Sequence, residues 1–211
     1  MTFTQISGNL FIITAASGAG KTSLVNALLE STVSNGTQLK KSVSHTTRAP
    51  RIGEVNDIDY HFVTEPQFLE ILNACGFLES ADVHGAKYGT SQIGVDTALQ
   101  AGIDVILEID WQGAAQVRKL YPQATSIFIL PPSIETLQQR LNNRGKDSLE
   151  VIARRVNAAR DEMRHLVEFD YVTINDSFDE ALQDLMAIIR TQRLKLNVQT
   201  ERHASLIQHL T

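Results

Sequence analysis

The chain has 211 residues, 43% hydrophobic and 20% charged, with a formal net charge of −5. These values suit one soluble globular domain and argue against a general nucleic-acid-binding protein, which usually has a basic balance. Cys75 is the only cysteine, so an internal disulfide framework is excluded. The first residues do not resemble a signal peptide and no apolar run is long enough to span a bilayer, so we expect a cytoplasmic protein without membrane contact.

Short apolar runs alternate with helical patterns along most of the chain. The runs predict buried strands at residues 9–14, 104–110, 126–130 and 171–175. Helices are expected directly after the first run and at about 91–101, 113–120, 133–144 and 147–168, with a final helix from about 178. This alternation predicts an α/β fold with a parallel sheet.

The stretch from about 37 to 90 has a different pattern. Its segments "KSVSHTT" and "DYHFV" are short, alternating and rich in β-branched or aromatic residues, and a helix is expected at about 65–74. We therefore expect a small α+β lobe inserted between the first helix and the second core strand.

The segment "AASGAGKTS", residues 15–23, matches most of the phosphate-loop template G-x-x-x-x-G-K-[ST]. Gly20, Lys21 and Thr22 match, whereas Ala15 stands where the template has its first glycine. A strand leads into the loop and an amphipathic helix leaves it, as an anion-binding loop requires. Lys21 would reach the β- and γ-phosphates of a nucleotide and Thr22 would ligate Mg²⁺. The alternative is a glycine-rich turn that only caps a helix.

Ala15 can replace glycine only if its φ is negative, so we expect an unstrained residue there. The loop alone indicates a phosphate-loop nucleotide-binding protein of no particular class. A GTPase would need a guanine-reading N-K-x-D segment, and the sequence has none.

Arg48 and Arg51 lie three residues apart around Pro50, in a pattern that suits a phosphate monoester. Glu54 follows closely and would orient the arginines. Tyr60 and Tyr88 would add phenolic hydroxyls. Taken alone, such a pair of arginines is more often a solvated basic loop.

Glu79 lies in the same lobe and is a candidate for reading guanine. Guanine presents N1–H and N2–H₂ side by side, and one carboxylate can accept from both, whereas adenine offers no such pair. Hydroxyls such as those of Ser44 and Thr90 would donate to guanine O6. By itself Glu79 is more often an exposed acid, so this role depends on its neighbours.

Asp110 ends a predicted strand, where a Mg²⁺-associated acid belongs, although it would also serve as a cap for the next helix. Arg140 and Arg144 share a helix face, Gly145 would end that helix, and Arg155 lies on the next. Two helices that carry arginines and meet at a glycine predict a mobile lid that brings positive charge onto the phosphates and excludes water. The alternative is two ordinary surface helices.

Several segments together resemble the signatures of the guanylate kinases. They are "VSHTTRAPRIGEVN", "FLESADVHGAKYGTS", "EIDWQGAAQV", "IFILPPS", "RLNNRGKDS" and "INDS", and they follow the family's order between about residues 8 and 190. The resemblance implies a three-layer phosphate-loop core (1–36, 96–136 and 166–211), a GMP-binding lobe (37–95) and a helical lid (137–165). It also implies phosphoryl transfer from ATP to GMP, and to dGMP, with Mg²⁺ as cofactor. Whether the chain forms a homo-oligomer stays open at this point.

The same resemblance assigns roles by position. It implies catalytic roles for Lys21, Arg48, Arg140, Arg144 and Arg155, and Mg²⁺ contacts for Thr22 and Asp110. The implied ATP site comprises Ala15, Ala16, Ser17, Gly18, Ala19, Gly20, Lys21, Thr22 and Asn175. The implied GMP site comprises Ser44, Arg48, Arg51, Glu54, Tyr60, Glu79, Tyr88, Thr90 and Glu108.

The sequence departs from the family at two places, with Ala16 where proline is usual and Glu108 where the first acid of Asp-x-Asp is usual. Two rivals remain at this stage. One is a binding module that has lost catalysis and holds a protein partner in its lobe, against which the intact Gly20, Lys21 and Thr22 argue. The other is a kinase for a different nucleoside monophosphate.

Overall fold

The computed structural model describes residues 8–34, 38–83, 85–143 and 149–211. Its centre is a five-stranded parallel sheet in the order β2-β7-β1-β8-β9. The strands are β1 (Leu10–Ala15), β2 (Leu39–Lys41), β7 (Asp104–Glu108), β8 (Thr125–Leu130) and β9 (Tyr171–Ile174). The predicted parallel α/β class is therefore confirmed.

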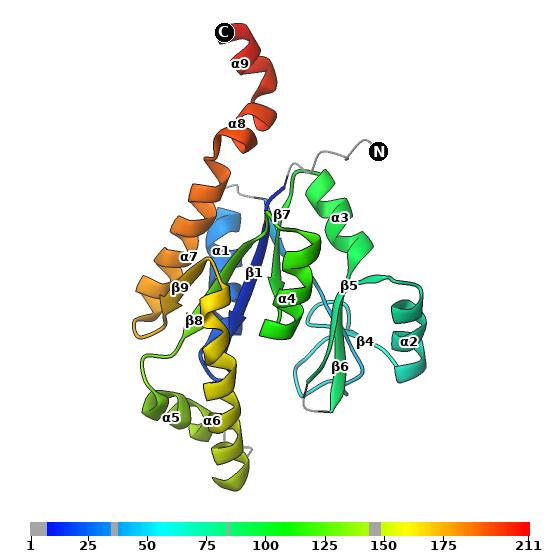
Figure 1. Cartoon of the computed structure of the whole chain (residues 1–211), viewed down its shortest axis with the longest axis vertical. Coiled ribbons are helices and arrows are strands. Elements are labelled where there is room, and N and C mark those ends of the chain that lie inside the picture. Colours follow the sequence, from blue (N-terminus) through cyan, green and yellow to red (C-terminus); the bar gives the residue numbers. More distant parts are fainter. Residues whose placement is uncertain (1–7, 35–37, 84, 144–148) are drawn as a thin grey trace.

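Helices cover both faces of this sheet (Figure 1). Alternate side chains of β1 divide between two cores: Leu10 and Ile12 pack with one cluster, and Phe11 and Ile13 with the other. The first core includes α3 (Gln92–Gln100) and α4 (Trp111–Leu120), and the second includes α1 (Lys21–Ser34) and α7 (Phe178–Arg193). The apolar runs are continuous because these strands are buried on both sides.

The inserted lobe has its own four-stranded sheet in the order β4-β3-β6-β5. Its elements are β3 (His45–Thr46), β4 (His61–Phe62), α2 (Glu65–Asn73), β5 (Phe77–Val83) and β6 (Ala86–Ser91). Strand β2, within the range expected for the lobe, instead pairs with β7 in the core sheet. Its sequence, Leu-Lys-Lys, lacks the apolar run that marks the central strands, because it lies at an edge of the sheet.

The segment predicted to form the lid contains α5 (Ile134–Asn143) and α6 (Leu149–Met163), which we call the lid helices. The helix expected over 147–168 ends earlier, because residues Arg164–Glu168 form a 3₁₀ turn that leads into β9. Apolar residues of both lid helices pack with Ala16 of the phosphate loop. The predicted hinge at Gly145, and Arg144 beside it, lie outside the described residues.

The C-terminal part breaks into three helices rather than one. After α7 come α8 (Leu196–Arg202) and α9 (Ala204–Leu210), which extend away from the sheet (Figure 1). No helix within the described ranges is both long and apolar enough to cross a membrane.

Asp104 joins the sheet to the end of α7. Its carboxylate is fully buried and accepts hydrogen bonds from the backbone N–H of Asn9 at 2.7 Å and from the Asn9 side chain at 3.0 Å. The Arg193 guanidinium donates to its other oxygen at 2.5 Å. Removing only one partner of such a buried ion pair is destabilising, because the other charge stays buried without its partner.

Replacing Asp104 with alanine is therefore expected to lower the free energy of unfolding by about 3–5 kcal/mol, because Arg193 and the Asn9 N–H lose their acceptor. Urea denaturation at pH 7 measures this change. Asp161→Ala is the matched control, since it removes an exposed carboxylate paired with Arg164 at 2.9 Å and should cost less than about 1 kcal/mol. Equal losses in the two variants would contradict this role for Asp104.

Candidate active site

The phosphate loop joins the end of β1 to the start of α1. Gly18 and Gly20 have φ values of +95° and +97°, a region that favours glycine. A Cβ at Gly20 would also lie 2.4 Å from the Asn175 side-chain nitrogen, so glycine is required there for space as well. Ala15 is not among the described residues with positive φ, which confirms that it is unstrained.

Two polar side chains, those of Asn175 and Arg140, hydrogen-bond to the backbone of the loop. The buried Asn175 donates from its side chain to the Ala19 carbonyl at 2.7 Å. Arg140 donates to the Ala19 carbonyl at 3.3 Å and to the Asn175 carbonyl at 3.0 Å. Both residues, expected from the sequence to be near ATP, thus contact the backbone that shapes the loop.

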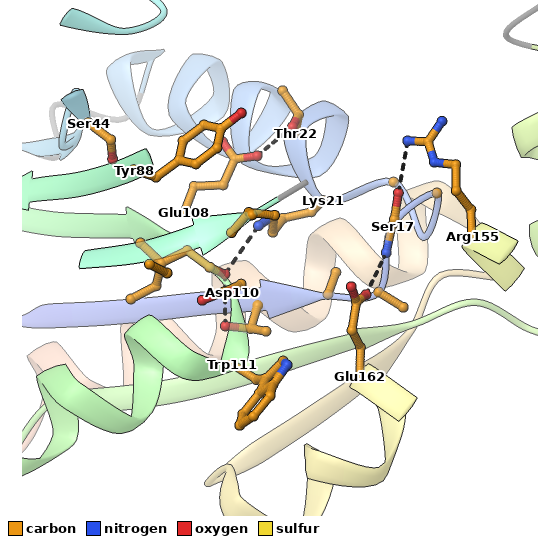
Figure 2. A pocket seen from close by; sticks show the side chains of 18 of the residues that line it. Ser17, Lys21, Thr22, Ser44, Tyr88, Glu108, Asp110, Trp111, Arg155 and Glu162 are labelled. Atoms are coloured by element: carbon orange, nitrogen blue, oxygen red, sulfur yellow. Dashed lines mark hydrogen bonds between the residues drawn. The ribbon is translucent and has the colours of Figure 1, made fainter. Parts of the chain in front are cut away.

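The end of the loop that carries Lys21 and Thr22 lies beside the end of β7 (Figure 2). The Lys21 ammonium donates to the Ile109 carbonyl at 3.2 Å, and the Thr22 hydroxyl donates to the Glu108 carboxylate. Lys41 lies 3.8 Å from the other Glu108 oxygen. A lysine, a hydroxyl and a carboxylate therefore meet at one edge of the sheet.

Asp110 caps helix α4, as the alternative from the sequence proposed. One of its oxygens accepts from the Gly113 N–H at 2.8 Å, and the other accepts from the Gln112 side chain at 3.2 Å. Asp110 also lines the pocket. Each of these bonds uses one lone pair of one oxygen, so both carboxylate oxygens keep further acceptor capacity.

In the lobe, Glu54 holds Arg48 in a bidentate ion pair. The two N–O distances are 2.9 and 2.8 Å, and Glu54 also accepts from the Arg51 backbone N–H at 2.7 Å. These bonds raise the pKa of Arg48 and lower the pKa of Glu54. The Tyr88 hydroxyl accepts from Arg48 Nε at 3.2 Å, while the Arg51 side chain is exposed and lines the pocket.

Glu79 is a buried carboxylate, only 4% exposed. The Thr90 hydroxyl donates to one of its oxygens at 2.6 Å, and Ser44 lies 3.4 Å from that hydroxyl. Loss of solvent around the carboxylate raises the pKa of Glu79 to about 7, although the bond from Thr90 acts in the opposite direction. The other oxygen lies beside Gly113, where a Cβ would approach it to 2.6 Å. The residue is thus a pocket acid that changes charge near neutral pH.

A single described pocket brings the loop, the lobe, the end of β7 and the lid together. The residues expected from sequence that line it are Ala15, Ala16, Ser17, Gly18, Gly20, Lys21, Thr22, Ser44, Arg51, Tyr60, Glu79, Tyr88, Glu108, Asp110 and Arg155. Behind this lining lie Ala19, Arg48, Glu54, Thr90, Arg140 and Asn175, each of which contacts a lining residue or supports the loop. Arg144 is outside the described residues.

The structure adds Glu162, which the sequence did not single out for the site, and gives Trp111 a place in the pocket wall. Glu162, on the lid helix α6, accepts from the backbone N–H of Ser17 at 3.1 Å (Figure 2). Trp111 lines the pocket and stacks on His165, with ring centroids 3.6 Å apart and planes within 8°. No sequence motif marks either contact, because each joins residues that are far apart in the chain.

Comparison with known proteins gives a consistent result. The sequence model of the family described as "Guanylate kinase" matches residues 7–192. A protein from Methylobacillus flagellatus, named "Guanylate kinase", is 64% identical over 97% of this chain and 100% of its own length. One of the same name from Pseudoalteromonas translucida is 52% identical over 98% of each chain. The crystal structure of guanylate kinase from Anaplasma phagocytophilum superposes with a TM-score of 0.75 at 32% identity, covering 90% of this chain and 88% of its own.

Proposed function

Because the chain belongs to the guanylate kinase family and is an ATP:GMP phosphotransferase, we propose that its pocket binds ATP over the phosphate loop and GMP against the lobe. The observation that carries this assignment is that Lys21 and Glu79 line the same pocket. A lysine suits the phosphates of ATP and a buried carboxylate suits guanine, so the pocket can hold the phosphoryl donor and the phosphoryl acceptor together.

At the ATP end, the backbone N–H groups of the glycine-containing loop precede a helix N-terminus, where phosphate binding is favourable. Asn175 and Arg140 both donate to the Ala19 carbonyl, which supports the loop geometry needed for that binding. Lys21 now donates to a neutral carbonyl at 3.2 Å. Charged phosphate oxygens are stronger acceptors, so Lys21 would turn to them when ATP binds.

At the GMP end, the ionised Glu79 would accept from guanine N1–H and N2–H₂. Thr90 already donates to Glu79, which fixes the carboxylate, and Ser44 lies beside Thr90 as a hydroxyl donor for guanine O6. Adenine has an acceptor at N1, which would face the carboxylate and be repelled. The pocket would therefore select guanine by the cost of leaving a buried carboxylate without donors.

The phosphate of GMP would bind the arginines of the lobe. Glu54 fixes Arg48 through two short bonds and anchors the turn at the Arg51 N–H, so both arginines start from a defined loop conformation. Tyr60 and Tyr88 line the adjoining wall and carry hydroxyls. Preorganised donors of this kind lose little entropy when an anion binds.

Hard oxygen donors suit Mg²⁺, and the end of β7 provides them next to the loop. The Thr22 hydroxyl is bonded to Glu108, and Asp110 lies two residues further on. We propose that Thr22 and Asp110 hold Mg²⁺, Asp110 directly or through water. Mg²⁺ would supply neutralisation of the charge on the ATP phosphates.

In the reaction, an oxygen of the GMP phosphate attacks the γ-phosphorus of ATP. The new P–O bond forms as the bond to the β–γ bridging oxygen breaks, which gives GDP and ADP. Lys21 and the lid arginines, Arg140, Arg144 and Arg155, would stabilise the charge spread over the transferring group. Catalysis in this scheme depends on position and charge and uses no protein base.

The direct test measures ADP release from Mg²⁺·ATP with GMP, AMP, CMP or UMP as acceptor. We expect turnover with GMP alone and a loss of at least about 100-fold in Lys21→Ala, which keeps the fold but removes charge from the transferring phosphoryl group. Turnover with AMP equal to that with GMP would contradict the acceptor assignment. A folded protein that binds GMP without turnover would favour a binding module.

Replacing Glu79 with glutamine tests the reading of guanine. The amide keeps the size of the carboxylate but presents an N–H₂ group to the guanine donors, so KM for GMP should rise roughly 10- to 100-fold at pH 8. KM for ATP should stay within about twofold, since Glu79 is assigned to the other end of the pocket. Asp82→Asn, on the same strand but exposed and paired with Lys87 at 3.1 Å, is the matched control. An equal rise in both KM values for Glu79→Gln would count against this role.

A further inference from the structure

Two side chains of lid helix α6 hydrogen-bond to Ser17 of the phosphate loop (Figure 2). Glu162 accepts from the Ser17 backbone N–H at 3.1 Å, and Arg155 donates to the Ser17 hydroxyl at 3.2 Å. The neighbouring Ala16 is buried among apolar side chains of both lid helices. These contacts therefore fix the position of the lid helices relative to the phosphate loop through protein groups alone.

The two polar contacts come from the same side of one helix. Arg155 and Glu162 are seven residues apart in α6, which is close to two helical turns. Both side chains are partly buried and both line the pocket. Because both side chains project from one helix, the bond that holds Glu162 on Ser17 also sets the direction from which Arg155 reaches the pocket.

The contacts differ in what a bound triphosphate would do to them. The bond from Arg155 to Ser17 ends on a neutral hydroxyl, and an anionic phosphate oxygen is a stronger acceptor than that hydroxyl. Glu162 carries the same sign of charge as the phosphates, so it gains nothing by turning to them, and its backbone donor remains in place. A bound triphosphate would therefore compete for the Arg155 bond to Ser17 but not for the Glu162 bond.

We propose that Glu162 is a positioning residue, which holds α6 on the phosphate loop so that Arg155 reaches the transferring phosphoryl group while water is kept out. This inference rests on the proposed function, because it concerns the efficiency of transfer to GMP. It assigns Glu162 no contact with either substrate. Its effect is exerted through Ser17 and Arg155.

The consequence is a change in the fate of the γ-phosphoryl group. In the coupled reaction a GMP oxygen attacks the phosphorus and ADP leaves. If α6 shifts relative to the phosphate loop, water can attack the γ-phosphorus instead. This attack breaks the same P–O bond and gives ADP, inorganic phosphate and a proton. Loss of Glu162 should therefore raise the ratio of ADP to GDP as well as lower the rate.

The experiment compares Glu162→Ala, Glu162→Gln and the matched control Asp161→Ala. Asp161 is the preceding residue on the same helix, exposed and paired with Arg164 at 2.9 Å. For Glu162→Ala we expect kcat for GDP formation to fall roughly 10- to 100-fold, the scale of a misplaced catalytic group. We also expect an ADP to GDP ratio that rises severalfold from near one. Glu162→Gln keeps an oxygen acceptor for the Ser17 N–H and should restore most of the coupling, and Asp161→Ala should behave as wild type.

A merely structural role would lower ADP and GDP formation together and leave their ratio unchanged, and that result would overturn the proposal. So would a ratio in Glu162→Gln as high as in Glu162→Ala, since the hydrogen bond would then not be the cause. Thermal melts verify that each variant is folded. If Glu162→Ala does not fold, Glu162→Met takes its place with the same expected ratio, because it keeps most of the side-chain volume and has no oxygen acceptor. Wild-type protein is assayed in parallel, to distinguish failure of this proposal from failure of the proposed function. Absence of GDP formation by the wild type would contradict the proposed function instead.

Discussion

Parallel pairing between β1 and β7 is the constraint on which the site depends. The register sets Ile13 opposite Glu108, so the phosphate loop that follows β1 emerges beside the acids that end β7. Thr14 and Lys21 both donate to the Ile109 carbonyl, at 3.0 and 3.2 Å, and tie the two strand ends together. Because side chains at the carboxyl ends of parallel strands share one edge, inserted segments can bring new groups to that edge without altering the core. The lobe and the lid are two such insertions.

Each insertion contributes through a buried or half-buried charge with a defined partner. Glu79 is held by Thr90, Arg48 by Glu54, and Glu162 by the Ser17 N–H. Removing charged groups from water is unfavourable, and these bonds offset part of that cost before a substrate binds. For Glu79 the offset is incomplete, which is why its pKa is raised to about 7 and why a ligand with two adjacent N–H donors suits it.

Much of the core was predictable from the sequence, because strands buried on both faces leave continuous apolar runs and the loop at 15–22 carries its own signature. The edge strand β2 was not, since Leu39–Lys41 has no run to mark it. Within the site, the local pattern identified Lys21, Arg48 and Glu79. The capping bond from the Gly113 N–H to Asp110 was recognised only as an alternative. The contact between Ser17 and Glu162 could not be predicted, because 145 residues separate its partners and only packing of the lid helices joins them.

The most direct test of the account is the number of protons released when GMP binds at pH 7, measured by titration calorimetry in two buffers of different ionisation enthalpy. A Glu79 pKa of about 7 means that the carboxyl is about half protonated in the free enzyme and must ionise to accept from guanine. The account predicts that wild type releases about half a proton more than Glu79→Gln, in which only the GMP phosphate and other groups titrate. Equal proton release by the two proteins would contradict the claim that Glu79 reads guanine as a carboxylate.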